Sequence, residues 1–190
     1  TCLHIMKKPY AALLGALIAI SGCTQKTPDA PVTREVTGVI KPTPKALPAA
    51  KVVKTKERVK LSKQEFECMA RNVYHEAGVE NNAGKIAVAQ VTLNRVKSKK
   101  WGKGVCDVVY SKAQFSWTLT KKKRFAQPKG NIWEASLDAV KQFEDGTRVQ
   151  QLMNSLFYHT DYIKKPNWAD SNLAVAKVGQ HIFYADARKS

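Results

Sequence analysis

Glu76 is the side chain in this sequence best placed to transfer a proton. Apolar residues precede it at helical spacing, and at roughly 100° per residue Glu76 falls about 20° outside Met69, at the margin of the apolar arc. The arc consists of Phe66, Met69, Ala70, Val73 and Ala77. A carboxyl group at such a margin can reach a cleft, while its apolar neighbours raise its pKa by disfavouring the charged form. Glu76 is therefore the candidate general acid. The alternative is a solvated helix residue, with Glu80, one turn further on, as the second candidate acid.

Cleavage of a glycosidic bond is a reaction that needs such an acid, because its poor leaving group must receive a proton. Ordinary hydrolysis also needs a second carboxylate, ~5 to 9.5 Å from the first. Besides Glu80 the sequence offers Asp107, Asp161 and Asp170, none of them clearly placed. A mechanism that uses one carboxylate twice is therefore favoured over hydrolysis.

Five further residues are candidate sugar-binding groups: Gln114, Phe115, Ser116, Tyr158 and His181. The amide and hydroxyl groups can bind sugar hydroxyls, Tyr158 offers an aromatic face for a pyranose ring, and His181 could orient Glu76 or contact the sugar. The alternative for Phe115 is a place in the core, and for His181 a structural role.

The N-terminus has the pattern of an export signal. Lys7 and Lys8 precede a short apolar run, residues 10–20, which is too short for a helix that crosses a bilayer. The run ends in Ile20-Ser21-Gly22-Cys23, which resembles the lipobox of bacterial lipoproteins. The resemblance implies a signal peptide over residues 1–22, a lipid on Cys23 and, with Thr24 following, the periplasmic face of the outer membrane in a Gram-negative cell. The alternative is an ordinary signal peptide.

Export also narrows the partners expected for the positive charge and the state expected for the cysteines. The formal net charge of +17 would attract nucleic acid, an anionic membrane or an anionic wall, and outside the cytoplasm nucleic acid is not an expected partner. Cys68 and Cys106 are the two cysteines of the folded domain, and we expect them to be bonded, because disulfides persist in exported proteins. The alternative is two buried thiols.

The elements that must position these residues lie after a tether. Residues 23–60 contain five of the eight prolines and predict an extended segment, with the catalytic domain at 61–190. Helices are predicted from the cap Ser62, paired with Glu65, to Gly78, then over about 82–97, and from Asn131, with a similar capping pattern, to Gly146. Residues 155–159 and 181–184 are short, aromatic and β-branched, as strands are. The predicted fold is α+β, a helical body with a minor β element beside a cleft.

Several blocks of this chain resemble the spore cortex-lytic (SleB/CwlJ-type) cell wall hydrolase family. They are Tyr74-His75-Glu76-Ala77, residues 87–96, residues 106–110 with 114–116, Phe157-Tyr158, and residues 179–184. The resemblance implies a lysozyme-like α+β domain with a small antiparallel β element. It also implies a lytic transglycosylase that cuts between N-acetylmuramic acid and N-acetylglucosamine, with Glu76 as acid and base. His75 stands where that family usually has glycine, and Gly78-Val79 where it has Arg-Gly, which puts the local substrate contacts in doubt.

Other functions remain open at this point. A zinc amidase or peptidase acting on wall peptides could draw ligands from His75, His159 and His181, but no HExxH spacing exists. A cysteine nucleophile conflicts with the expected bridge. A non-catalytic peptidoglycan-binding lipoprotein would use the same cleft. We expect no metal and no cofactor, a monomer, and two partners, peptidoglycan and, through Cys23, the membrane.

Overall fold

The computed structural model describes residues 46–186, which all belong to one compact unit. The predicted signal peptide, Cys23 and the first part of the predicted tether lie outside the described residues. The helices are α1 (Lys63–Ala77), α2 (Asn82–Ser98), α3 (Val105–Tyr110), α4 (Lys121–Phe125) and α5 (Asn131–Glu144). The strands are β1 (Val52–Lys54), β2 (Thr147–Val149), β3 (Ser155–Thr160), β4 (Ala174–Val178) and β5 (His181–Ala185). Within this range no helix is long and apolar enough to cross a membrane.

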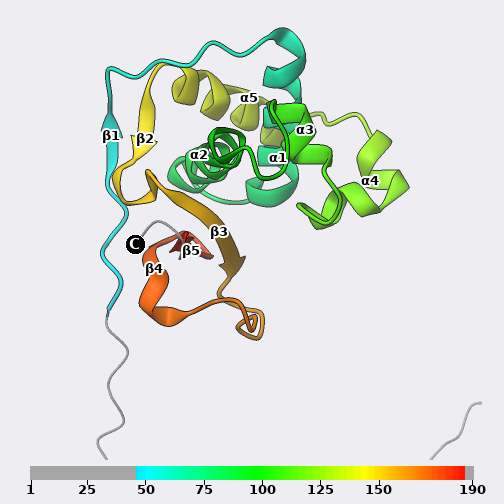
Figure 1. Cartoon of the computed structure of the whole chain (residues 1–190). Helices are drawn as coiled ribbons and strands as arrows, with labels where there is room; N and C mark the ends of the chain where they lie inside the picture. Colours follow the sequence, from blue (N-terminus) through cyan, green and yellow to red (C-terminus); the bar gives the residue numbers. More distant parts are fainter. Residues whose placement is uncertain (1–45, 187–190) are drawn as a thin grey trace, which may run out of the picture. The chain divides into compact units, whose positions relative to one another are not determined.

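Helix α2 is the centre of the fold. Every residue from Gly84 to Arg95 is buried, because α1, α5 and the strands β2 and β3 surround the helix. Figure 1 looks nearly along α2, with α5 above it and β3 below it. The helix predicted over about 82–97 is present, and its sequence, which is apolar on most sides, explains its central position. The polar side chains near its end must therefore find partners inside the protein.

The predicted boundaries of α1 are confirmed. The Ser62 side chain accepts a hydrogen bond from the backbone of Glu65, and the Glu65 carboxylate accepts one from the backbone of Ser62. The helix ends at Ala77, before Gly78. Helix α5 begins at Asn131, as expected, but Gly130 precedes it and no side-chain cap is formed, so the predicted capping pattern there is wrong.

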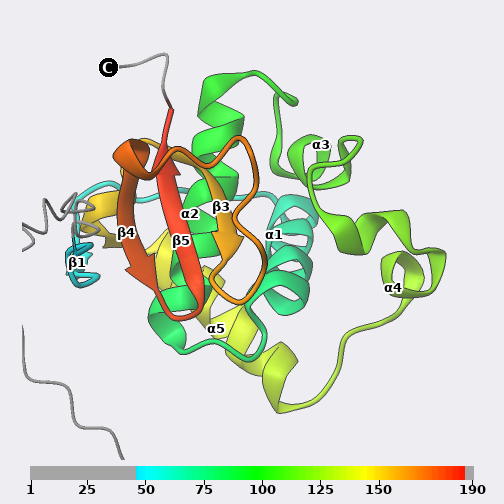
Figure 2. The same cartoon turned by 90° about the horizontal axis from the view of Figure 1, so that it is seen from below.

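A three-stranded antiparallel sheet packs against the helical body. Its strand order is β3-β5-β4, and it places Tyr158 opposite Phe183 and His159 opposite Ile182. Figure 2 views this sheet with α2 behind it. The two predicted strands are therefore neighbours, which confirms the small β element. Strand β4 was not predicted.

The folded part of the chain begins before residue 61. Strand β1 lies inside the expected tether, yet it pairs antiparallel with β2, with Val53 opposite Arg148. Arg148 donates a hydrogen bond to the carbonyl of Glu57 at 3.1 Å, which fixes the next stretch of chain. Residues 46–60 therefore contribute to the domain.

The predicted disulfide is present. Cys68 on α1 and Cys106 on α3 are bonded, with their Cα atoms 5.3 Å apart. The bridge closes a loop with a sequence separation of 38 residues. In the loop-entropy model such a bridge contributes roughly 4 kcal/mol to stability.

Candidate active site

Glu76 and Tyr158 meet where the last turn of α1 faces β3. The Tyr158 hydroxyl donates a hydrogen bond to Oε2 of Glu76 at 3.0 Å, across 82 positions of sequence. Tyr158 packs against Phe183 and, edge to face, against His181. Among residues 46–186 no hydrogen bond is found for Oε1 of Glu76. The arrangement therefore holds one carboxyl group by one of its two oxygens.

Burial decides the proton affinity of this carboxyl group. It raises the pKa of Glu76 above the ordinary value, and the opposing effects of the Tyr158 hydrogen bond and of the positive charges of Arg95 and Lys123 are smaller. Burial also raises the pKa of Tyr158 well above its ordinary range, so this phenol keeps its proton and stays a donor. A glutamic acid in this setting is suited to give a proton near neutral pH.

Arg95 lies near the Tyr158 ring, and the sequence did not indicate it as a site residue. It is 7 % exposed, its Nε donates to the carbonyl of Leu156 at 2.8 Å, and its guanidinium carbon lies 5.9 Å from the centre of the Tyr158 ring. Its charge is among the causes that lower the pKa of Glu76. The available signal was an arginine on a helix that is apolar on most sides. Such a residue is buried and must be held by specific partners.

The Gln114 to Ser116 segment lies beside Arg95, but its three side chains differ. Phe115 is 3 % exposed and belongs to the core, and the Arg95 guanidinium carbon lies 4.9 Å from its ring centre. Gln114 is partly exposed and Ser116 is exposed. The placement of Phe115 fits the core alternative. Only Gln114 and Ser116 are accessible to a ligand.

His181 packs against Tyr158, and Glu80 lies beside His181. His181 is buried, its Nδ1 is 3.7 Å from Oε1 of Glu80, and burial lowers its pKa. The Glu80 carboxylate accepts a bond from the backbone of Gln180 at 3.3 Å. Glu80, the second candidate acid, is thus engaged in holding the turn between β4 and β5.

The other carboxylates that could assist hydrolysis are engaged locally. Asp107 accepts backbone hydrogen bonds from Lys103 and Gly104 at the start of α3. Asp161 forms an ion pair with Lys177. The Asp170 carboxylate accepts a bond from the backbone of Asn172 at 2.9 Å, so it caps a short turn.

The histidines of the zinc alternative are engaged in separate contacts. His75 stacks on Trp117 at 4.3 Å between ring centres, and His159 bonds to the Tyr184 hydroxyl at 2.8 Å. Between residues 46 and 186 no three His, Cys, Asp or Glu side chains lie close enough to hold a metal ion. The zinc alternative therefore has no ligand set in the described part of the chain.

Solved structures and curated proteins resemble this chain over its folded part. The catalytic domain of Bacillus cereus SleB is 26% identical, with a TM-score of 0.53 over 70% of this chain and 98% of that one. The catalytic domain of the germination-specific lytic transglycosylase SleB from Bacillus anthracis is also 26% identical, with a TM-score of 0.53 over 67% of this chain and 99% of that one. These likenesses agree with the α+β fold.

Spore cortex-lytic enzymes are similar in sequence. The enzyme of Oceanobacillus iheyensis is 28% identical over 122 residues, which are 64% of this chain and 42% of that protein. The enzyme of Bacillus subtilis is 26% identical over 122 residues, again 64% of this chain and 38% of that protein. The chain thus spans less than half the length of these relatives. A family model described as Cell Wall Hydrolase matches residues 79–184, more than half of the chain, beginning three positions after Glu76. The chain belongs to the cell wall hydrolase family.

Proposed function

We propose that this chain is a lytic transglycosylase that cuts peptidoglycan strands between N-acetylmuramic acid and N-acetylglucosamine, with Glu76 as its acid and base. The observation that carries the proposal is the single half-buried carboxyl group held by Tyr158, with every other candidate carboxylate engaged elsewhere. Similarity to the B. anthracis domain, a lytic transglycosylase, supports the same reaction.

The reaction needs only one carboxyl group. Glu76 gives its proton to the glycosidic oxygen as the bond from that oxygen to C1 of muramic acid breaks. The resulting carboxylate then takes the proton of the 6-hydroxyl of the same sugar while that oxygen bonds to C1. A 1,6-anhydro ring forms, Glu76 regains its proton, and no water is consumed. The charge changes on Glu76 occur beside a neutral phenol and a buried guanidinium, which limit the cost of the ionised state.

Three groups support this cycle. Tyr158 fixes the Glu76 carboxyl group through Oε2, and the Arg95 guanidinium carbon lies 5.9 Å from the centre of the tyrosine ring. Gln114 and Ser116 are candidate hydrogen-bonding groups for the sugar, whereas Phe115 is a support for Arg95. His181 packs on Tyr158 and is a positioning residue in this proposal.

The experiment is mass spectrometry of peptidoglycan digested by the wild type and by Glu76→Gln. Products that end in 1,6-anhydro-muramic acid, absent with the variant, are the expected result. Glu134→Gln is the matched control, because Glu134 is exposed on α5. Reducing-end muramic acid would show hydrolysis instead, freed peptides would show an amidase, and binding without any product would show a non-catalytic wall-binding protein.

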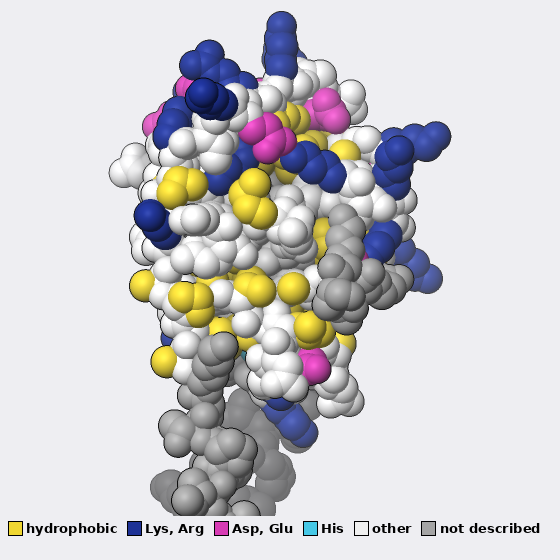
Figure 3. Space-filling model, turned by 60° about the vertical axis from the view of Figure 1, so that its left-hand side comes forward, with side chains coloured by type: hydrophobic (Ala, Val, Ile, Leu, Met, Phe, Trp, Pro, Cys, Tyr) yellow, Lys and Arg dark blue, Asp and Glu magenta, His cyan; other side chains and the backbone are white. Residues whose placement is uncertain are grey.

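We also propose that the chain acts outside the cytoplasm as a monomeric lipoprotein. The lipobox-like residues before Cys23 and the proline-rich segment after it support a lipid anchor followed by a tether. The many lysines and arginines that project from the folded part (Figure 3) suit an anionic wall or membrane surface. Incorporation of labelled palmitate that is lost in Cys23→Ala tests the anchor, fractionation of a Gram-negative host tests the outer-membrane placement, and light scattering tests the monomer.

A further inference from the structure

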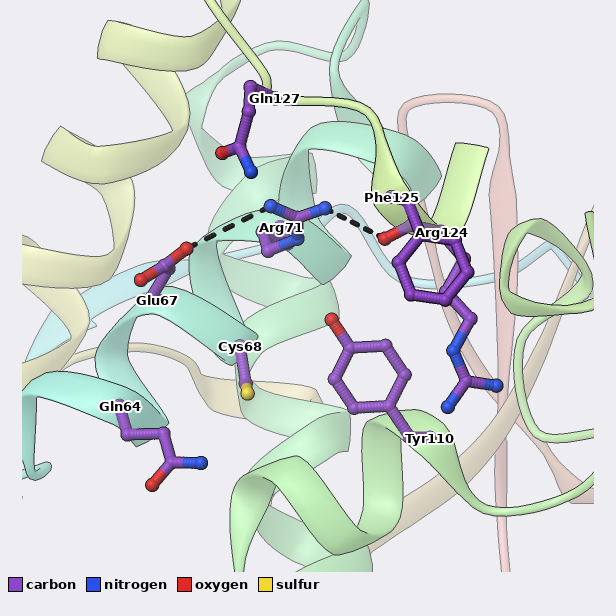
Figure 4. Close-up of a pocket in the computed structure, with 8 residues that line it drawn as sticks. All are labelled: Gln64, Glu67, Cys68, Arg71, Tyr110, Arg124, Phe125 and Gln127. Carbon is purple, nitrogen blue, oxygen red and sulfur yellow. Dashed lines mark hydrogen bonds and ion pairs between the residues drawn. The ribbon is translucent and has the colours of Figure 1, made fainter. Parts of the chain in front are cut away.

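A hollow of about 400 Å³ lies beside the first half of α1, apart from the groups assigned above. Figure 4 shows α1 on one side of it and the side chains of α3 and α4 on the other. Its lining includes Glu67, Arg71, Tyr110, Arg124, Phe125 and Gln127. The volume is that of a site for a small ligand. None of the predicted sugar-binding residues lines it.

Arg71 is the fixed charge of this hollow. It is 6 % exposed, and its Nη2 donates to the carbonyl oxygens of Arg124 at 2.9 Å and Ala126 at 2.7 Å. It thereby ties the end of α4 to α1. Its Nη1 contacts Glu67 at 3.8 Å, which is too long for a hydrogen bond. In the described part of the chain this ion pair is the one polar contact recorded for Nη1, so its hydrogens remain available to a ligand.

The lining carries charges of both signs. Arg124 is exposed, and its guanidinium carbon lies 5.1 Å from the centre of the Tyr110 ring. Glu67 has a side chain that is 56% exposed, and it lies on the other side of Arg71 from Arg124 in Figure 4. A simple anion would meet repulsion from Glu67, and a simple cation would meet two arginines. A group with an amine and a carboxylate satisfies both.

We propose that this hollow binds the zwitterionic end of a peptidoglycan stem peptide, an amino-acid group with a free amine and a free carboxylate. The carboxylate would lie on Arg124 and Arg71, and the amine on Glu67. The inference rests on the proposed function, since stem peptides branch from the muramic acid at which the strand would be cut.

The hollow and Glu76 lie on different sides of α1. Arg71 precedes Glu76 by five residues, about 7.5 Å along the helix axis and about 140° around it. Helix α4 connects the two regions, because Arg124 lines the hollow while the charge of the adjacent Lys123 acts on Glu76 and on His75. A peptide that leaves the sugar at Glu76 would reach the hollow by passing around α1 along α4.

The test compares two substrates, peptide-bearing peptidoglycan and the same glycan stripped of peptides by an amidase. Arg124→Ala and Glu67→Gln should each lower kcat/KM about tenfold on the peptide-bearing substrate, the loss of one charged hydrogen bond, and leave cleavage of stripped glycan unchanged. Lys122→Ala is the matched control, since it removes a positive charge from the exposed surface of α4 outside the hollow.

The outcomes separate this inference from the proposed function. Cleavage of stripped glycan by the wild type establishes the glycan reaction whatever the hollow does, and no cleavage of either substrate refutes that reaction. Equal losses on both substrates, or an equal loss in Lys122→Ala, would overturn the peptide site.

A binding measurement addresses the amine directly. Glu76→Gln is used to prevent turnover. A stem tripeptide whose last residue bears an amine and a carboxylate is titrated by NMR, beside the same peptide acetylated on the amine of that last residue. Acetylation should weaken binding about tenfold in the presence of Glu67 and not further in Glu67→Gln. Equal affinity for the two peptides would exclude Glu67 as the amine partner and overturn the proposal.

Discussion

Removal of the Tyr158 hydroxyl should move the pH range in which the enzyme works. The hydroxyl donates a 3.0 Å hydrogen bond to Glu76, and this bond is among the causes that lower the pKa of Glu76. A hydrogen bond to a charged group contributes about 1.5–3 kcal/mol. In Tyr158→Phe the ionised form of Glu76 loses this stabilisation, so the ratio of protonated to ionised Glu76 at a given pH rises about tenfold or more.

The sign of the effect follows from the role of Glu76 as the first proton donor. Activity should fall as the pH rises through the pKa of Glu76, and a higher pKa moves this fall to higher pH. The maximal rate should drop about tenfold or more, because the carboxyl group is no longer fixed through Oε2. The phenyl ring of the variant retains its packing against Phe183 and His181, so the fold should survive.

The assay is kcat/KM on solubilised glycan across a pH series, for the wild type, Tyr158→Phe and the control Tyr162→Phe. Tyr162 is exposed in the loop after β3, and its variant should match the wild type. An alkaline limb that stays in place or moves to lower pH in Tyr158→Phe would refute the assignment of Glu76 as the proton donor held by Tyr158.

Three further outcomes concern stability. Reduction of the bridge between Cys68 and Cys106 should lower the melting temperature and cost up to roughly 4 kcal/mol, with activity retained below the new transition; loss of activity without any change in melting would contradict a purely structural bridge. Gly179→Ala should destabilise the domain by about 1–3 kcal/mol, since φ is +58° and the added Cβ would overlap the Glu80 carboxylate, and an unchanged urea midpoint would contradict the packing of this turn. Arg95→Lys should cost about 2 kcal/mol in urea unfolding, because lysine has no Nε–H donor and no planar guanidinium to lie against the rings; the exposed Lys97→Arg is its control.

Local signals were sufficient for the limits of α1 and for the existence of β3 and β5. Ser62 and Glu65 interact across three residues, and Gly78 follows the last apolar position of the helix, so neighbours along the chain contain the information. The same is true of the disulfide only in part, since the sequence supplied the pair but not the distance between α1 and α3.

The strands β1 and β4 depended on partners far along the chain. Val53 pairs with Arg148, and Lys177 pairs with Ile182 in a sheet whose central strand is β5. Such short strands are stable only when a partner satisfies their backbone groups. The proline content of residues 23–60 did not indicate the point at which the chain joins the domain, since β1 lies within that range.

The candidate site also depends partly on local sequence and partly on contacts between distant positions. By itself the sequence determined the residue types, a glutamate at the margin of an apolar helix face and an arginine on a buried helix, because helical periodicity is a local property. Only the tertiary structure decided that Tyr158 would hold Glu76 and that Arg95 would lie near the Tyr158 ring. It also decided that Glu80 would accept a hydrogen bond at the turn of Gly179. These contacts join positions about 60 to 100 residues apart, and their geometry comes from the packing of α1, α2 and the sheet around one core.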